Sequence, residues 1–264
     1  MRTLRAITVF YVASLIGAPL YLVFHETLIQ GSHGLWISLH DPQMLAAMRL
    51  TAVIALVVTP FNVIFGVGAS LAIVRRPTRW TRILDLGIDV PLAISPIIVG
   101  VMLELAYSFN GWFGAPLAEH GFRIMFSWPG IAMASAVVSL PLVSRELIPL
   151  LREIGESQEL TAATLGAGTW RTFFTITLPA MRWALAYGLL LTLARVIGEY
   201  GAVLIVSGNV AFQTQTLTLN IGENFENYNQ SLGFTGASLL ALTSIIALFT
   251  LNIIKQREGS RREH

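Results

Sequence analysis

Apolar residues run along this chain in long blocks that are separated by short polar or charged segments. A helix needs about 20 residues to cross a hydrocarbon core about 30 Å thick. Six blocks approach or exceed that length with few charges: Ala6–Phe24, Thr51–Val74, Ile88–Tyr107, Ile124–Val143, Leu178–Val206 and Gly236–Ile254. The pattern therefore predicts an all-α, polytopic membrane protein with six transmembrane helices.

Composition supports this fold class. The 264 residues are 54% hydrophobic and 12% charged, whereas a soluble domain carries about 25% charged residues. The charged start, MRTLR, resembles that of a signal peptide, but its apolar stretch exceeds the roughly 7 to 15 residues of a signal h-region and no clear cleavage site follows. We interpret the stretch as the first membrane helix.

The basic residues are distributed very unequally between the two sides that six spans define. One side carries 14 Lys and Arg residues, in the N-terminus, the segment RRPTRWTR, the region around residues 145–182 and the C-terminal tail, whereas the other side carries only Arg49 and Arg123. By the positive-inside rule the richer side is cytoplasmic, and both termini lie there. Because the basic residues alternate with apolar runs, membrane orientation explains them better than nucleic acid does.

One polar stretch, ELTAATLGAGTWRTFFTITLP, lies in the longest cytoplasmic loop, from about Ser144 to Thr177. We expect Ser157 to cap a short helix and Gly166 to end it in the left-handed conformation. Pro179 would occupy the first turn of the next helix. The residues alone leave two interpretations open: an interfacial helix on lipid headgroups, or a docking surface for a cytoplasmic partner.

Several kinds of chemistry are excluded by the sequence. Cysteine is absent, and the only lysine, Lys255, is followed by Gln256, so the chain has no phosphate-binding G-x-x-x-x-G-K-[ST] loop. The patterns G-x-S-x-G and H-E-x-x-H are also absent, and the five histidines lack metal-ligand spacing. We therefore expect no catalytic residue, no bound metal and no cofactor.

Charges inside the predicted spans are costly and are candidates for function. Arg195 and Glu199 are spaced i, i+4 and can pair, with Glu104 in the third span as a further candidate partner. The alternatives are a structural ion pair, an anion path in which Arg195 binds a tetrahedral oxyanion, and a proton relay through Glu104 and Glu199. Ser207 and Asn209, on either side of Gly208, either line the outer mouth of a path or end the helix.

Small residues and proline near these charges allow helices to pack closely or to break. We expect close packing to be the commoner reason for them. They are Ser95, Pro96, Gly100, Gly198, Gly201 and Gly208.

The spacing in the polar stretch resembles the signature of bacterial ABC-importer permeases. That signature is Glu-Ala-Ala, three residues, Gly, nine residues and Ile-x-Leu-Pro, and it matches from Gly166 through Ile176 and Leu178 to Pro179. At the front, Leu160, Thr161 and Ala162 occupy the Glu-Ala-Ala positions, and Glu159 stands one position early.

Other blocks narrow the resemblance to W-type permeases of sulfate/thiosulfate importers. NGWFGAPLAEHG and SLPLVSRELIPLL are the closer pointers, whereas GEYGAV is shared with molybdate permeases. Where the relatives read Thr-Leu-Pro-Leu, this chain has Thr-Leu-Thr-Leu from Thr216. Molybdate or tungstate import is therefore the alternative within the class, and a proton-coupled anion carrier is the alternative outside it.

The resemblance implies a type I importer in the bacterial inner membrane. This subunit and a T-type permease would sit over two ATPase subunits that use ATP and magnesium, and an extracytoplasmic binding protein would deliver sulfate. It also implies three regions: residues 1–45 with the first helix and an external loop, a permease core at 46–254, and a basic tail at 255–264. The ATPase would couple through Glu159, Leu160, Thr161, Ala162, Ala163, Gly166, Ile176, Leu178 and Pro179.

Overall fold

The computed structural model describes residues 7–8 and 10–262, and every regular element within them is helical. Arg2 and Arg5, which count toward the predicted charge asymmetry, and Ala6, which begins the predicted first span, lie outside the described residues. The elements are η1 (Ala13–Gly17), α2 (Ala18–Ile29), α3 (Gly31–Leu39), α4 (Pro42–Arg75), α5 (Arg79–Ala93), α6 (Pro96–Tyr107), α7 (Gly114–Glu119), α8 (Trp128–Ser139), α9 (Pro141–Ile154), α10 (Ser157–Thr164), α11 (Thr169–Thr172), η2 (Phe173–Thr177), α12 (Leu178–Ile197), α13 (Gly201–Ser207), α14 (Leu217–Glu226) and α15 (Gln230–Arg262).

Five helical segments are long and apolar enough to cross a membrane: residues 10–29, 42–75, 128–154, 169–197 and 230–250. A sixth span results if α5 and α6 are taken together, although the chain bends by 113° between them. The six-span, all-α prediction is confirmed when the bent pair is taken as one span.

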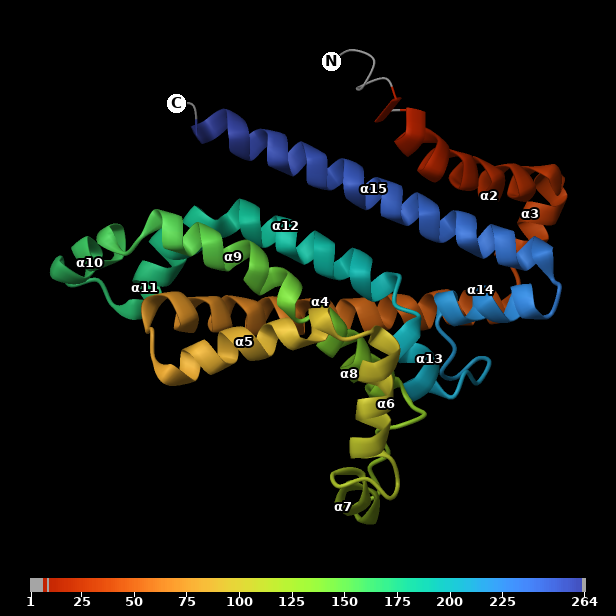
Figure 1. Cartoon of the computed structure of the whole chain (residues 1–264), viewed down its shortest axis with the longest axis horizontal. Coiled ribbons are helices and arrows are strands. Elements are labelled where there is room, and N and C mark those ends of the chain that lie inside the picture. The colour runs from red at the N-terminus through yellow and green to blue at the C-terminus, as the bar shows by residue number, and fades with distance from the viewer. Residues whose placement is uncertain (1–6, 9, 263–264) are drawn as a thin grey trace.

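The predicted third span is wrong as a continuous helix. The backbone leaves the helix at Ile94, which is extended, and at Ser95, whose ψ of 138° is not helical, and it restarts at Pro96. Proline disfavours the helical conformation for the residue before it and has no N–H to donate, so the break falls at this position. In Figure 1, α6 consequently points away from the long helices and carries α7 at its far end.

The predicted polar loop is shorter than residues 144–177. Helix α9 continues to Ile154, because Val143, Leu147 and Leu151 form a buried stripe that packs against α12, with Met181 in the same cluster. Arg145 and Arg152 project from the opposite face of α9 and form ion pairs with Asp89 and Asp85 of α5, respectively.

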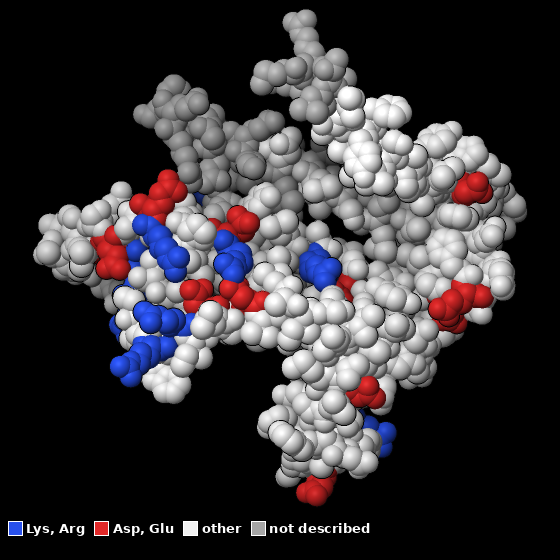
Figure 2. Space-filling view, viewed as in Figure 1, with Lys and Arg blue, Asp and Glu red and all other residues white. Residues whose placement is uncertain are grey.

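The long helix α4 forms the middle of the molecule. Its residues Ile54 and Val58 pack with Ile131 of α8, Val196 of α12 and Leu219 of α14 in one buried cluster. Figure 1 shows α10 and α11 at one end of α4, and α13 and α14 toward the other. Charged side chains gather toward the α10 end in Figure 2, whereas the rest of this face carries them only in isolated patches.

Candidate functional site

Helix α10 is short, and its C-terminal end matches the prediction. Gly166 has φ +81°, and the N–H groups of Gly166 and Ala167 donate to the carbonyls of Ala163 and Ala162, each at 3.0 Å. These two bonds form a Schellman motif, which satisfies carbonyls that the helix leaves free. The prediction for Ser157 is wrong: Ser157 is the first helical residue, and Glu156 holds the cap position without a side-chain capping bond.

The surface of α10 is open. None of its eight residues, all of them described, is buried, and Leu165 directly after it is 83% exposed. An open groove of about 410 Å³ runs beside the helix. Its lining comprises Ser157, Gln158, Thr161, Ala162, Leu165 and Ile176. Exposed leucines beside small side chains allow another protein to approach closely, and a purely interfacial helix would need a larger apolar face.

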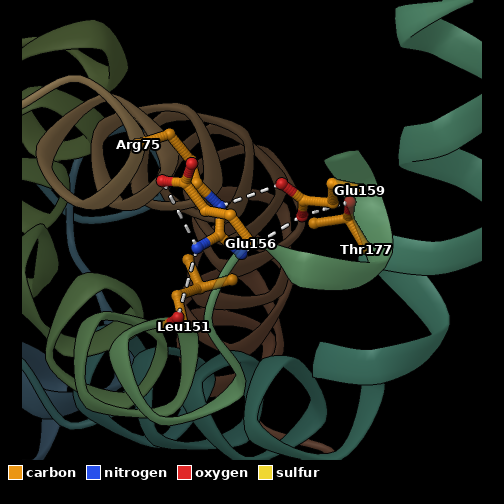
Figure 3. Close-up of polar contacts among 5 residues, drawn as sticks. All are labelled: Arg75, Leu151, Glu156, Glu159 and Thr177. Carbon is orange, nitrogen blue, oxygen red and sulfur yellow. Dashed lines mark hydrogen bonds and ion pairs between the residues drawn. The ribbon is translucent and has the colours of Figure 1, made fainter. Parts of the chain in front are cut away.

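Glu159 is the exception on this helix because its carboxylate faces the rest of the chain. Its Oε2 lies 3.0 Å from Arg75 Nε, and its Oε1 accepts from Arg75 Nη2 at 3.1 Å and from the Thr177 hydroxyl at 2.7 Å. Arg75 Nη1 donates to the Leu151 carbonyl at 3.3 Å and lies 3.9 Å from Glu156 Oε1. We call these five residues the Arg75 cluster (Figure 3).

Pro179 lies in the first turn of α12, as the sequence predicted, although a π turn leads directly into that helix. The helix runs without interruption from Thr169 to Ile197, and a single π turn, η2, precedes the proline. A proline removes one backbone hydrogen bond and its ring meets the carbonyl four residues earlier, and a π turn locally widens the helix there. Ile176 lies on the groove beside α10, and Leu178 packs against the α9–α12 cluster.

The predicted pair of charges within the membrane segments is present. Arg195 Nη2 lies 3.3 Å from Glu199 Oε2, with side chains 44% and 2% exposed. Glu199 Oε1 accepts from the Ala202 N–H at 2.9 Å, in the first turn of α13. Within residues 7–8 and 10–262, no ion pair reaches Glu104, so Glu104 is not the further partner of this pair.

The predicted fifth span, to Val206, is interrupted between Ile197 and Gly201. A separate helix, α13, follows and packs closely on α6: a Cβ on Gly100 would lie 2.8 Å from the Ala202 carbonyl oxygen. Close packing therefore explains Gly100, and a helix break explains Gly198.

Ser207 and Asn209 end α13. The buried Ser207 hydroxyl accepts from the Asn209 N–H at 3.0 Å, and Gly208 between them has φ +71°. The side-chain Oδ1 of Asn209 then accepts from Gln215 Nε2 at 3.1 Å, and Gln215 Oε1 accepts from Asn220 Nδ2 at 3.0 Å. The side-chain amides of Asn209 and Gln215 also donate to the Glu223 carboxylate, so amide–amide and amide–carboxylate hydrogen bonds together hold this end of the molecule.

Sequence reasoning missed the roles of Arg75 and Thr177. Arg75 counted only toward the charge asymmetry, and Thr177 only as the variable position of Ile-x-Leu-Pro. A basic residue in the last turn of a long helix, before Pro77, was the available signal, because it marks a side chain that can meet nearby helix ends.

Comparisons with known proteins agree with this geometry. Residues 64–259 match the family model described as binding-protein-dependent transport system inner membrane component. The chain is 40% identical to the sulfate transport system permease protein CysW of Synechococcus elongatus, over 97% of this chain and 90% of the relative. The CysW of Escherichia coli is 39% identical over 93% and 84% of the two chains.

More distant matches extend the comparison. The sulfate transport system permease protein CysT of Escherichia coli is 33% identical over 86% of this chain and 82% of the relative. The fold resembles the crystal structure of a bacterial ABC transporter involved in the import of the acidic polysaccharide alginate. That match has a TM-score of 0.76 at 14% identity and covers 97% of this chain and 94% of the other. The chain therefore belongs to the family of binding-protein-dependent transport system inner membrane components, the permease subunits of ABC importers.

Proposed function

We propose that this chain is the W-type permease subunit of an ATP-driven importer for sulfate or thiosulfate. The observation that carries the substrate is the 40% identity, over nearly the whole chain, with a permease named for sulfate transport. Relatives named CysW and CysT both match, so the second permease is a T-type chain. Two ATPase subunits and an extracytoplasmic sulfate-binding protein complete the assembly.

Helix α10 is the element that couples to an ATPase. It is exposed along its length, has a groove beside it and lies at the end where charged side chains gather. The 14-to-two distribution of basic residues supports a cytoplasmic location for this end and for both termini. Closure of the ATPase dimer would move α10, and the permease would switch between inward- and outward-facing states as packed rigid bodies.

The other end of the chain suits delivery by a binding protein. The segment from residue 207 to 230 contains Glu223 and Glu226 without any Lys or Arg. Such a segment repels free divalent anions, so the binding protein supplies both capture and selectivity. ATP and magnesium are used by the partner ATPases.

Uptake by the complete importer tests the substrate. Proteoliposomes with all subunits and external binding protein should take up radiolabelled sulfate only with internal ATP, and unlabelled sulfate or thiosulfate should compete. Competition by molybdate or tungstate alone would reassign the substrate. Uptake by this chain alone, driven by a pH gradient without an ATPase, would instead identify a proton-coupled carrier.

A further inference from the structure

The carboxylate of Glu159 is engaged on both oxygens by this chain. Arg75 Nη2 donates to Oε1 at 3.1 Å, and Nε lies 3.0 Å from Oε2 as an ion-pair contact without a hydrogen bond. A guanidinium can bring two nitrogens to one carboxylate in this way, whereas an ammonium cannot. The side chains of Arg75 and Glu159 are only 15% and 23% exposed. The pair is therefore more shielded from water and salt than an ordinary surface ion pair.

The position of Arg75 explains why an arginine is stable there. It is the last residue of α4, and its Nη1 reaches the Leu151 carbonyl in the last turn of α9 at 3.3 Å. A positive charge is favoured at the C-terminal ends of both helices, and Glu159 is favoured in the first turn of α10. One guanidinium thus joins the ends of α4 and α9 to the start of α10.

Thr177 adds a fourth element to this connection. Its buried hydroxyl donates to Glu159 Oε1 at 2.7 Å from the end of the π turn that leads into α12. Figure 3 shows Glu159 between Arg75 on one side and Thr177 on the other. Helix α10 contributes no buried side chain, so these polar contacts are the specific attachments of its first turn.

We infer that Arg75 is a positioning residue for coupling: through Glu159 and Thr177 it fixes α10 to α4, α9 and α12. A displacement of α10 by an ATPase then moves the ends of these three helices together, instead of bending the linkers around α10. This inference rests on the proposed function, because it assigns α10 the ATPase contact.

A second consequence concerns that ATPase contact. Since Glu159 is satisfied within the chain, docking of α10 depends on the exposed leucines and the groove rather than on a carboxylate. Leu160, Leu165 and Trp170 are the large apolar side chains exposed at this end of α10 and α11.

The test uses the complete importer in proteoliposomes, with binding protein, sulfate and ATP. Arg75→Gln removes the connection, Arg75→Lys keeps the charge without the paired contacts, and Arg76→Gln is the matched control at the exposed neighbouring arginine. Two quantities are measured: sulfate taken up per ATP hydrolysed, and the mobility of a spin label on Thr164→Cys. The chain contains no cysteine, so this label is site-specific.

We expect Arg75→Gln to lower uptake per ATP about five- to tenfold, within the range of known coupling effects, and to mobilise the label. Arg75→Lys should be intermediate, and Arg76→Gln should match the wild type. Wild-type uptake per ATP and an immobile label in Arg75→Gln would overturn the inference and leave the proposed function intact.

Two further outcomes also test the inference about Arg75. If the wild type hydrolyses ATP but imports no sulfate, the proposed substrate fails, and the label alone judges the inference: mobility in Arg75→Gln beyond that in Arg76→Gln supports it, and equal mobility refutes it. If Arg75→Gln does not assemble, Arg75→Lys and Thr177→Val replace it. Reduced coupling and a mobile label in both support the inference, and wild-type behaviour in either overturns it.

Discussion

Two Arg–Glu pairs in this molecule differ in what they join. Arg75 and Glu159 lie 84 residues apart and connect separate helices through two short contacts, with both side chains mostly shielded. Arg195 and Glu199 lie one helical turn apart and meet at a single distance of 3.3 Å, with the glutamate buried and the arginine nearly half exposed. The first pair determines where a whole helix sits, whereas the second stabilises one local break.

The difference shows that the oppositely charged partner of an intramembrane charge need not contribute most of its stabilisation. Burying a carboxylate is expensive unless it accepts hydrogen bonds. Glu199 obtains one from the Ala202 N–H, which would otherwise be an unsatisfied donor in the first turn of α13. The Thr218 hydroxyl also donates to the Glu199 carbonyl oxygen at 2.8 Å. Glu199 therefore belongs to the break between α12 and α13 as much as to its pair with Arg195.

Glu199→Ala should remove the local Arg195–Glu199 pair and produce the largest loss of stability. It leaves the Ala202 N–H without its acceptor, at a cost of about 2 kcal/mol. The midpoint of thermal unfolding in detergent should fall clearly. Glu226→Ala, at an exposed glutamate of α14, should leave it unchanged; equal effects of the two substitutions would show that burial and the Ala202 bond do not matter.

Gly166→Val should instead disturb α10, the helix that the Arg75–Glu159 pair holds in place. A β-branched residue in the left-handed region costs about 1–2 kcal/mol and misplaces the end of α10. ATP hydrolysis stimulated by binding protein should fall while the chain still inserts into the membrane. Gly168→Val is the control, because Gly168 has φ −70° and open space around its Cβ position. Unchanged stimulation in Gly166→Val would remove this glycine from coupling.

Arg195→Gln should have the smallest effect if the pair is structural. The half-exposed guanidinium makes one contact at 3.3 Å, and after the substitution the Ala202 N–H still donates to the carboxylate, so sulfate uptake should stay within about twofold of the wild type. Uptake assays on correctly assembled importer decide this. Loss of uptake with unchanged thermal stability would instead assign the guanidinium to the anion path.

Much of the fold could be read from hydropathy, because each long apolar block had to become a helix in a solvent that cannot satisfy a free backbone. The breaks could not be placed in the same way. Uncharged residues run from Val90 to Leu103 on both sides of Ser95, and the bend there depends on Pro96 and on the packing of Gly100 against Ala202. The interruption after Ile197 likewise depends on contacts with α6 that are distant in sequence.

The candidate site was predictable in its location but not in its connections. The spacing from Gly166 to Pro179 located α10, and the i, i+4 rule predicted the pair of Arg195 with Glu199. The partner of Glu159 was not accessible, since Arg75 is 84 residues away and lies beside α10 only after α4, α9 and α12 have packed. Pairing rules work within one helix, whereas contacts between helices require the tertiary arrangement.

The π turn at Phe173–Thr177 gives the nine-residue interval between Gly166 and Ile176 a different meaning. One residue added to a helix rotates everything after it by about 100°. The wider π turn absorbs such a residue, so Met181 still faces α9. The interval from Gly166 to Ile176 therefore fixes an angle as well as a length, because it sets the rotational phase in which α12 meets its neighbours.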